Sequence, residues 1–172
     1  MLYFRIRFLL IGLFITVGFA LLYLMGIWAA IPSFTAALVL IISFFLLGTV
    51  GPAFTKLKRG KLKEADHLIH LTYFPNLLLR RHKSYYHFVK GMLALQKKEL
   101  VDGETNFKTA LALGLRNDND KSFASLNLAH INFVQGNYDQ SKQYLAACKK
   151  YEFDDLMLSE KIEELEKALK SH

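Results

Sequence analysis

The sequence predicts an all-α protein, with an N-terminal two-helix transmembrane hairpin followed by a short α-solenoid and a capping helix. Two observations lead to this prediction. Residues 8–55 contain no charged side chain, whereas all 15 acidic residues come after position 63. Small and apolar residues then recur every 38 positions, as repeated helical hairpins require. We therefore expect a membrane domain at 1–55 and a soluble domain at 56–172.

The membrane domain contains two runs without a charged side chain, at 8–30 and 33–55. Each run exceeds the about 20 apolar residues that an α-helix needs to cross roughly 30 Å of hydrocarbon. Pro32 stands between the runs and predicts the turn, in the sequence Ile31-Pro32-Ser33. Trp28, just before it, predicts that this tip lies at a membrane–water interface.

A cleaved signal peptide is the alternative interpretation of residues 1–30. Arg5 and Arg7 would form its basic region, and Ala29 and Ala30 would lie near its cleavage site. However, the apolar run is longer than the about 7 to 15 residues of a signal core, and a second run follows at once. The sequence therefore favours an uncleaved hairpin that anchors the protein.

Basic side chains lie outside both ends of the hairpin. Arg5 and Arg7 precede the first run. Five membrane-proximal basic residues follow the second run: Lys56, Lys58, Arg59, Lys61 and Lys63. Because basic residues beside a span stay on the cytoplasmic side, both termini are expected in the cytoplasm, with anionic lipid headgroups near the basic segment. A bacterial inner membrane is the expected location, and an organelle membrane is the alternative.

The net charge of +7 is unevenly distributed. Residues 54–90 carry nine basic and two acidic side chains, whereas residues 151–172 carry three basic and seven acidic ones. Lipid phosphate accounts for the basic cluster, and no nucleic-acid-binding motif is present, so no nucleic-acid partner is expected. The spans contain no Asp, Glu, Lys, Arg or His, which argues against a transporter.

The soluble domain is organised around residues 127–148, which indicate two amphipathic helices joined at Gly136 and Asn137. Its small and apolar positions, Ala129, Tyr138, Ser141, Leu145 and Cys148, correspond at offsets of 38 to Gly91, Leu100, Gly103, Phe107 and Ala110, and then to Ala53, Leu62, Ala65, Ile69 and Thr72. Small residues let antiparallel helices approach closely. The predicted packing residues of the repeats are Ala65, Gly91, Gly103, Phe107, Ala110, Ala129, Ser141, Leu145 and Cys148.

The first and last segments complete the array. The leading helix of the first copy, around 48–59, would overlap the end of the second span, and Pro52 would kink it. Its second helix would follow at about 61–72, so that the repeats grow from the membrane helix without a flexible linker. Residues 155–170 have leucines and Ile162 at roughly helical spacing, which predicts a C-terminal capping helix.

These spacings resemble those of the tetratricopeptide (TPR) repeat family over residues 53–155. The family's usual period is 34, so each unit here would carry about four extra residues. The chain departs from the family pattern where His87 and Ser125 replace the expected Trp. The layout of two spans followed by helical repeats is also similar to the HemY family of bacterial inner-membrane proteins, which would imply an accessory link to late haem synthesis.

The TPR resemblance implies a peptide groove, because the first helix of each hairpin lines a concave surface in that family. Its side chains here would be Tyr85, Phe88, Met92 and Leu95, then Phe123, Leu126, His130 and Phe133. The family's clamp for a C-terminal carboxylate uses Lys and Asn, whereas this chain has apolar residues and His130 at those positions. The predicted occupant is an apolar helix or extended peptide of an unidentified partner protein.

No residue pattern indicates catalysis. His67 and His70 stand three apart on a predicted helix, but no matching Glu-x-x-His group occurs on another helix. The single cysteine, Cys148, excludes an internal disulfide and a cysteine-based zinc site. A nucleophile motif, P-loop or dinucleotide fingerprint is also absent. We expect no enzyme activity, no catalytic residue, no cofactor and no bound metal.

The sequence therefore predicts a membrane-anchored scaffold or adaptor that binds a partner protein or peptide at the cytoplasmic membrane face. Two alternatives remain. The chain would be a structural or accessory subunit of a membrane complex if its spans bind neighbouring subunits. It would be a metal-binding or enzymatic accessory domain if His67 and His70 bind a metal.

Overall fold

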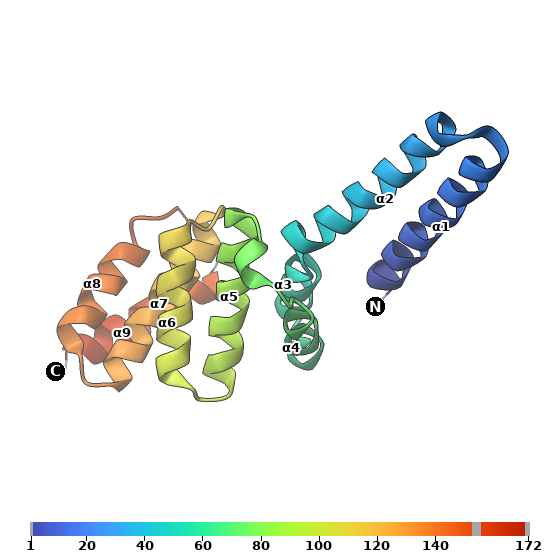
Figure 1. Ribbon diagram of the computed structural model, residues 1–172. Helices are drawn as coiled ribbons and strands as arrows, with labels where there is room; N and C mark the ends of the chain where they lie inside the picture. Colours follow the sequence, from blue (N-terminus) through green and yellow to red (C-terminus); the bar gives the residue numbers. More distant parts are fainter. Residues whose placement is uncertain (1, 153–155, 171–172) are drawn as a thin grey trace. The chain divides into compact units, whose positions relative to one another are not determined.

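A computed structural model describes residues 2–152 and 156–170 of the chain (Figure 1). These residues form nine α-helices and one short 3₁₀ helix, η1, with no strand among them, and this confirms the predicted all-α fold class. The chain divides into two compact units, Met1–Gly48 and Thr49–His172. The sequence-based prediction placed this boundary at residue 55.

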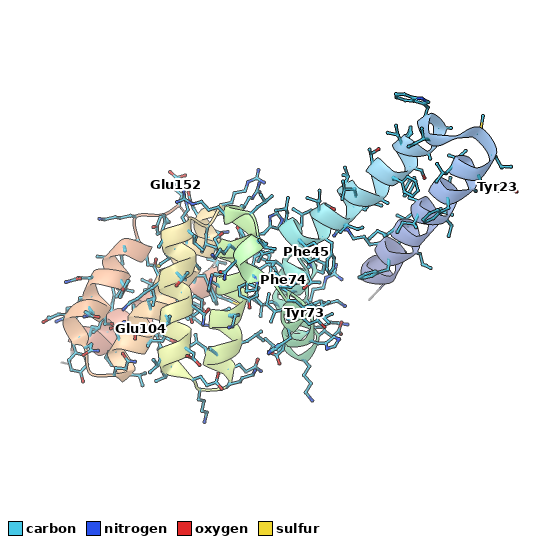
Figure 2. The ribbon with its side chains drawn as sticks, viewed as in Figure 1. Tyr23, Phe45, Tyr73, Phe74, Glu104 and Glu152 are labelled. Atoms are coloured by element: carbon cyan, nitrogen blue, oxygen red, sulfur yellow. The ribbon has the colours of Figure 1, made fainter. Side chains whose placement is uncertain are left out.

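Unit 1 is a hairpin of two apolar helices, α1 (Leu2–Met25) and α2 (Ile27–Leu47), which lie side by side (Figure 1). The segments Ile6–Met25 and Ile27–Leu47 are long and apolar enough to cross a membrane, a property that an N-terminal signal sequence shares. The hydroxyl of Ser33 donates a hydrogen bond to the carbonyl of Phe14 at 2.7 Å and so joins the two helices. Tyr23 (Figure 2) is 90% exposed near the tip.

The position of the turn in unit 1 differs from the prediction. The chain reverses at Gly26, whose φ of 85° is accessible to glycine, and Pro32 lies inside α2. Proline removes one backbone donor near the start of this helix, and the helix continues through it. The second apolar helix ends at Leu47 rather than at residue 55, because the next residue, Gly48, leaves the helical conformation with a φ of 58°.

Unit 2 contains three helical hairpins and a final helix. Its elements are α3 (Val50–Lys58), α4 (Leu62–His70), η1 (Pro75–Leu77), α5 (Arg80–Gln96), α6 (Leu100–Leu113), α7 (Asp118–Val134), α8 (Tyr138–Cys148) and α9 (Leu156–Lys170). Gly48 and Thr49 separate α3 from α2, so the predicted overlap with the second span is wrong. Pro52 does not kink α3, because it lies in the first turn, where a helix needs no backbone donor.

The three turns inside these hairpins share one geometry at intervals of 38 residues. Gly60, Lys98 and Gly136 all adopt left-handed backbone conformations, with φ of 70°, 62° and 79°. The next amide in each turn donates to the carbonyl five residues earlier: Lys61 to Lys56, Glu99 to Ala94 and Asn137 to Asn132, at 2.8 to 3.0 Å. This bond satisfies a carbonyl that the helix end would otherwise leave open. The turn predicted at Gly136 is confirmed.

The residues predicted to pack the hairpins are buried. Phe107, Ala110, Ala129, Ser141 and Cys148 are fully enclosed, and the other members of the set are also buried. The Ser141 hydroxyl donates to the Ala129 carbonyl at 2.7 Å, which joins α8 to α7. A Cβ atom at Gly91 would lie 3.1 Å from the Phe107 ring, which shows how closely α5 and α6 approach. Small side chains at these positions therefore permit the observed helix contacts.

Candidate functional site

A groove of about 440 Å³ lies between α7 and α9. Its lining residues are Phe123, Leu126, Asn127, His130, Phe133, Val134, Lys161, Glu164, Leu165 and Ala168. They include all four α7 residues that the sequence assigned to a peptide groove. These side chains share one face because Phe123, Leu126, His130 and Phe133 follow each other at helical spacing of three or four residues.

Helix α9 forms the second wall because one of its faces is apolar. Leu158, Ile162, Leu165 and Leu169 are buried, and they form a common core cluster with Leu126 and Ala129 of α7 and with Leu145 and Cys148 of α8. A hydrogen-bonded ion pair between Lys149 and Glu166 adds a polar contact at the edge. The predicted segment began at Asp155, which lies outside the described residues.

The groove has an apolar floor and a polar rim. Leu126 and Leu165 are buried at the floor, and Phe123 and Phe133 are partly buried beside them. His130, Lys161 and Glu164 are exposed. An apolar floor provides binding free energy through burial of a ligand's surface, while charged groups at the rim set its orientation.

The four groove residues predicted on α5 are distributed differently. Phe88 is buried in the core, with ring centroids 5.7 Å from Phe54, 5.9 Å from Phe107 and 6.1 Å from Phe123. Met92 and Leu95 are partly buried against the same core. Tyr85 lines a cavity that is separate from the groove at α9. The structure therefore brings the α7 residues together and places the α5 residues elsewhere.

The cavity at Tyr85 has a volume of about 640 Å³, and its lining includes three basic side chains, Lys58, Arg81 and Arg116. Its residues are Val50, Gly51, Phe54, Lys58, Arg81, His82, Tyr85, Arg116, Asn117 and Asp120. Asp120 is buried, accepts a hydrogen bond from the Tyr85 hydroxyl at 2.9 Å and lies 3.5 Å from the Lys58 ammonium. Burial and the Asp120 carboxylate raise the pKa of Tyr85. Sequence reasoning missed this cavity because its walls come from three separate helices and a loop.

The five basic residues after the second apolar run lie on α3, on α4 and in the turn between them. Lys56 and Lys61 both pair with Glu64, at 2.5 and 3.2 Å, and Lys58 pairs with Asp120. Hydrogen bonds from the two lysines lower the pKa of Glu64. Arg59 and Lys63 are exposed. Three of the five cations are thus engaged by carboxylates of unit 2.

The histidines and the cysteine considered for chemistry differ in their surroundings. His70 Nδ1 lies 2.8 Å from the carbonyl of Asp66, and His67 is exposed. Among residues 2–152 and 156–170, no group of three His, Cys, Asp or Glu side chains is placed to hold a metal. Burial raises the pKa of the Cys148 thiol, which donates to the Ser122 carbonyl, while the Ser122 hydroxyl donates to the Cys148 carbonyl. A raised pKa disfavours the thiolate, which is the reactive form of cysteine.

Comparison of the chain with protein-family models, curated proteins and solved structures found no match. The groove between α7 and α9 is therefore interpreted from its own residues and geometry.

Proposed function

We propose that this chain is a membrane-anchored helical-repeat adaptor that holds an apolar segment of a partner protein in the groove between α7 and α9. One observation supports this proposal above the others. The four α7 residues chosen from the repeat pattern, Phe123, Leu126, His130 and Phe133, line one groove together. An amphipathic helix or extended peptide would place its apolar side chains on this floor.

The repeat character of the adaptor is supported by the three equivalent turns. Gly60, Lys98 and Gly136 have the same backbone conformation at the interval found in the sequence, as stacked units of one design would have. In this proposal the units are TPR-like, and α9 is the capping helix that covers the apolar face of the last hairpin. The groove is then a product of the cap, because α9 supplies its second wall.

The anchor in this proposal is the uncleaved α1–α2 hairpin, with both termini on the cytoplasmic side of a bacterial inner membrane. It is supported by the length and apolar composition of both helices and by the absence of charge between Arg7 and Lys56. Mass spectrometry of protein purified from membranes tests the anchor, because a cleaved signal would remove about 30 residues. Fluorescence of a C-terminal green fluorescent protein fusion tests the cytoplasmic orientation.

Site-specific photocrosslinking in native membranes tests the groove. A photoreactive amino acid at Val134, at the groove rim, is expected to capture a partner segment rich in apolar residues. The same probe at Val101, an exposed apolar position of α6 outside the groove, serves as the control. Adding Phe133→Glu should remove the Val134 adduct, whereas Val101→Glu should leave it intact. Equal adducts from both probe positions, or an adduct insensitive to Phe133→Glu, would contradict the proposal.

A further inference from the structure

The first hairpin of unit 2 returns the chain to the point where this unit begins. Thr49 precedes α3, and its hydroxyl donates to the carbonyl of Leu68 in α4 and lies 2.9 Å from the hydroxyl of Thr72. Both threonines are buried. The residue after Thr72 is therefore held close to the first residue of unit 2, although more than twenty positions separate them in sequence.

The segment that follows Thr72 exposes several large apolar side chains. These are Tyr73, Phe74, Leu77 and Leu79, and the first is 72% exposed. Tyr73 and Phe74 can be found in Figure 2 on the connection from α4 to α5. Leu78 is buried in the core and η1 fixes the backbone before it, so Leu77 and Leu79 on either side remain exposed. Four large apolar side chains exposed within seven consecutive residues indicate a contact surface.

Positive charge adjoins this apolar segment. Arg80, Arg81 and Lys83 follow Leu79 directly, and residues 67–98 contain no Asp or Glu. Arg80 Nε donates to the carbonyl of Leu113 at 3.0 Å, which holds this side chain at the end of α6. The segment therefore joins exposed aromatic and leucine side chains to a basic border.

Within unit 2, Arg59, Lys61 and Lys63 come after the end of α3, one helix length beyond Thr49. Helix α3 leads away from Thr49, and its nine residues extend about 13 Å before the chain reaches Arg59. Lys56 and Lys61 are also occupied by Glu64. Arg81 lines one cavity with Val50 and Gly51, so folding brings the later basic residues back to the beginning of the unit, where Lys58 also borders that cavity.

We propose that residues 73–81 form a second membrane-contacting surface, which lies in the headgroup region of the bilayer that α2 crosses. This inference depends on the proposed membrane anchor. Only Gly48 and Thr49 separate α2 from α3, and three residues of extended chain span about 10 Å at most. Aromatic and leucine side chains bind at the boundary of headgroups and acyl chains, and arginines bind lipid phosphates. We favour a bilayer over a protein partner for this surface. The hydrogen bond between Thr49 and Thr72 holds the start of the segment near Thr49, which follows the apolar helix α2 by two residues.

Fluorescence of single-cysteine variants of the full chain tests this surface in vesicles of phosphatidylcholine and phosphatidylglycerol. Cys148→Ala provides the background, since Ala110 occupies the corresponding buried position one repeat earlier. An environment-sensitive fluorophore is attached in turn at Tyr73→Cys, Leu77→Cys, Lys61→Cys, Val101→Cys and Phe19→Cys. We expect blue-shifted emission and loss of intensity with a lipid-borne quencher at positions 73 and 77, but not at positions 61 and 101.

Position 19, in α1, separates failure of this inference from failure of the anchor. Quenching by lipid at position 19 without quenching at 73 and 77 overturns the inference and leaves the anchor in place. Absence of quenching at position 19 rejects the anchor and the inference with it. A blue shift at 73 and 77 without lipid quenching would show that these positions contact protein instead of lipid. Quenching at 61 instead of 73 would show that the basic residues after α3 contact the bilayer. Either result overturns the inference.

Discussion

In the hairpin of unit 1 and in the second hairpin of unit 2, the two helices meet where a glycine of one helix contacts a phenylalanine of the other, at the same sequence spacing. Gly18 of α1 faces the ring of Phe34 in α2, and Gly91 of α5 faces the ring of Phe107 in α6. In both hairpins the phenylalanine follows the glycine by 16 residues. The absence of a side chain at each glycine lets the two helices approach closely.

The surroundings of the two rings differ. Phe107 is fully buried and packs edge-on against Phe88, so protein covers it on every side. Phe34 is partly buried, and its neighbouring ring, Phe19, is 62% exposed. Unit 2 thus excludes water from its glycine–phenylalanine contact by itself, whereas unit 1 leaves apolar surface exposed around its contact. The same local contact therefore stabilises a fold in water only where further side chains enclose it.

Removing the Phe107 ring should have the largest effect on unit 2. Phe107→Ala is expected to lower the free energy of unfolding by about 3–5 kcal/mol, because it leaves a cavity in a fully buried position. Urea unfolding of the full chain in detergent, followed by circular dichroism, measures this change. Val101→Ala on the same helix is the control, and it should change the free energy by about 0.5 kcal/mol or less, since Val101 is exposed. A similar loss in both variants would show that Phe107 is not part of a cooperative core.

Substituting leucine for the glycine of each hairpin should show directly that the two hairpins respond differently. Gly91→Leu is expected to destabilise unit 2 by about 1–3 kcal/mol, because a Cβ there would already lie 3.1 Å from a ring that is buried on all sides. Gly18→Leu should leave the urea transition of unit 2 unchanged, since the affected contact lies within unit 1. Equal shifts of that transition would mean that the two units unfold together.

The contrast between the hairpins also explains what the sequence could predict. In unit 2 a single period of 38 residues related the hairpin at 127–148 to two earlier copies, so each copy supported the others, and the turn at Gly136 was placed correctly. Unit 1 has one hairpin and no second copy for comparison. Pro32 was the turn signal in that sequence, but the reversal depends on the positive φ of Gly26. No residue beside Gly26 indicates this backbone conformation.

The candidate site was predictable to the extent that it depends on one helix. Helical spacing identified the α7 side chains, and they share a groove. The same spacing on α5 chose Phe88, which is buried because Phe54, Phe107 and Phe123 approach it from three other helices. Burial of this kind depends on contacts with other helices, which the spacing of residues within one helix does not indicate. The cavity around Asp120 was missed for the same reason.

The turn at Gly136 depends on a backbone conformation that glycine adopts more readily than other residues. Gly136→Lys should destabilise unit 2 by about 1–2 kcal/mol, because φ at this position is 79° and a side chain is disfavoured there. The same urea titration measures the change. Asn137→Lys, at the next residue with φ of −86°, is the control and should cost less. If both variants lose the same stability, added charge rather than backbone conformation is responsible.

Lys98 is the one described non-glycine residue with positive φ, and it occupies the position that glycine holds in the other two turns. A left-handed conformation costs a residue with a Cβ about 1–2 kcal/mol, whereas glycine adopts it freely but gains entropy in the unfolded chain. Lys98→Gly is therefore expected to stabilise unit 2 by about 0.5–1 kcal/mol in urea unfolding, the smallest effect considered. Lys97→Gly should instead destabilise it by at least a similar amount, since φ at Lys97 is −80° and glycine there brings the entropic cost together with loss of the ion pair between Lys97 and Asp66 at 3.2 Å. Destabilisation by both variants would mean that the Lys98 side chain contributes more through its contacts than its backbone conformation costs, and the middle turn would then differ in kind from those at Gly60 and Gly136.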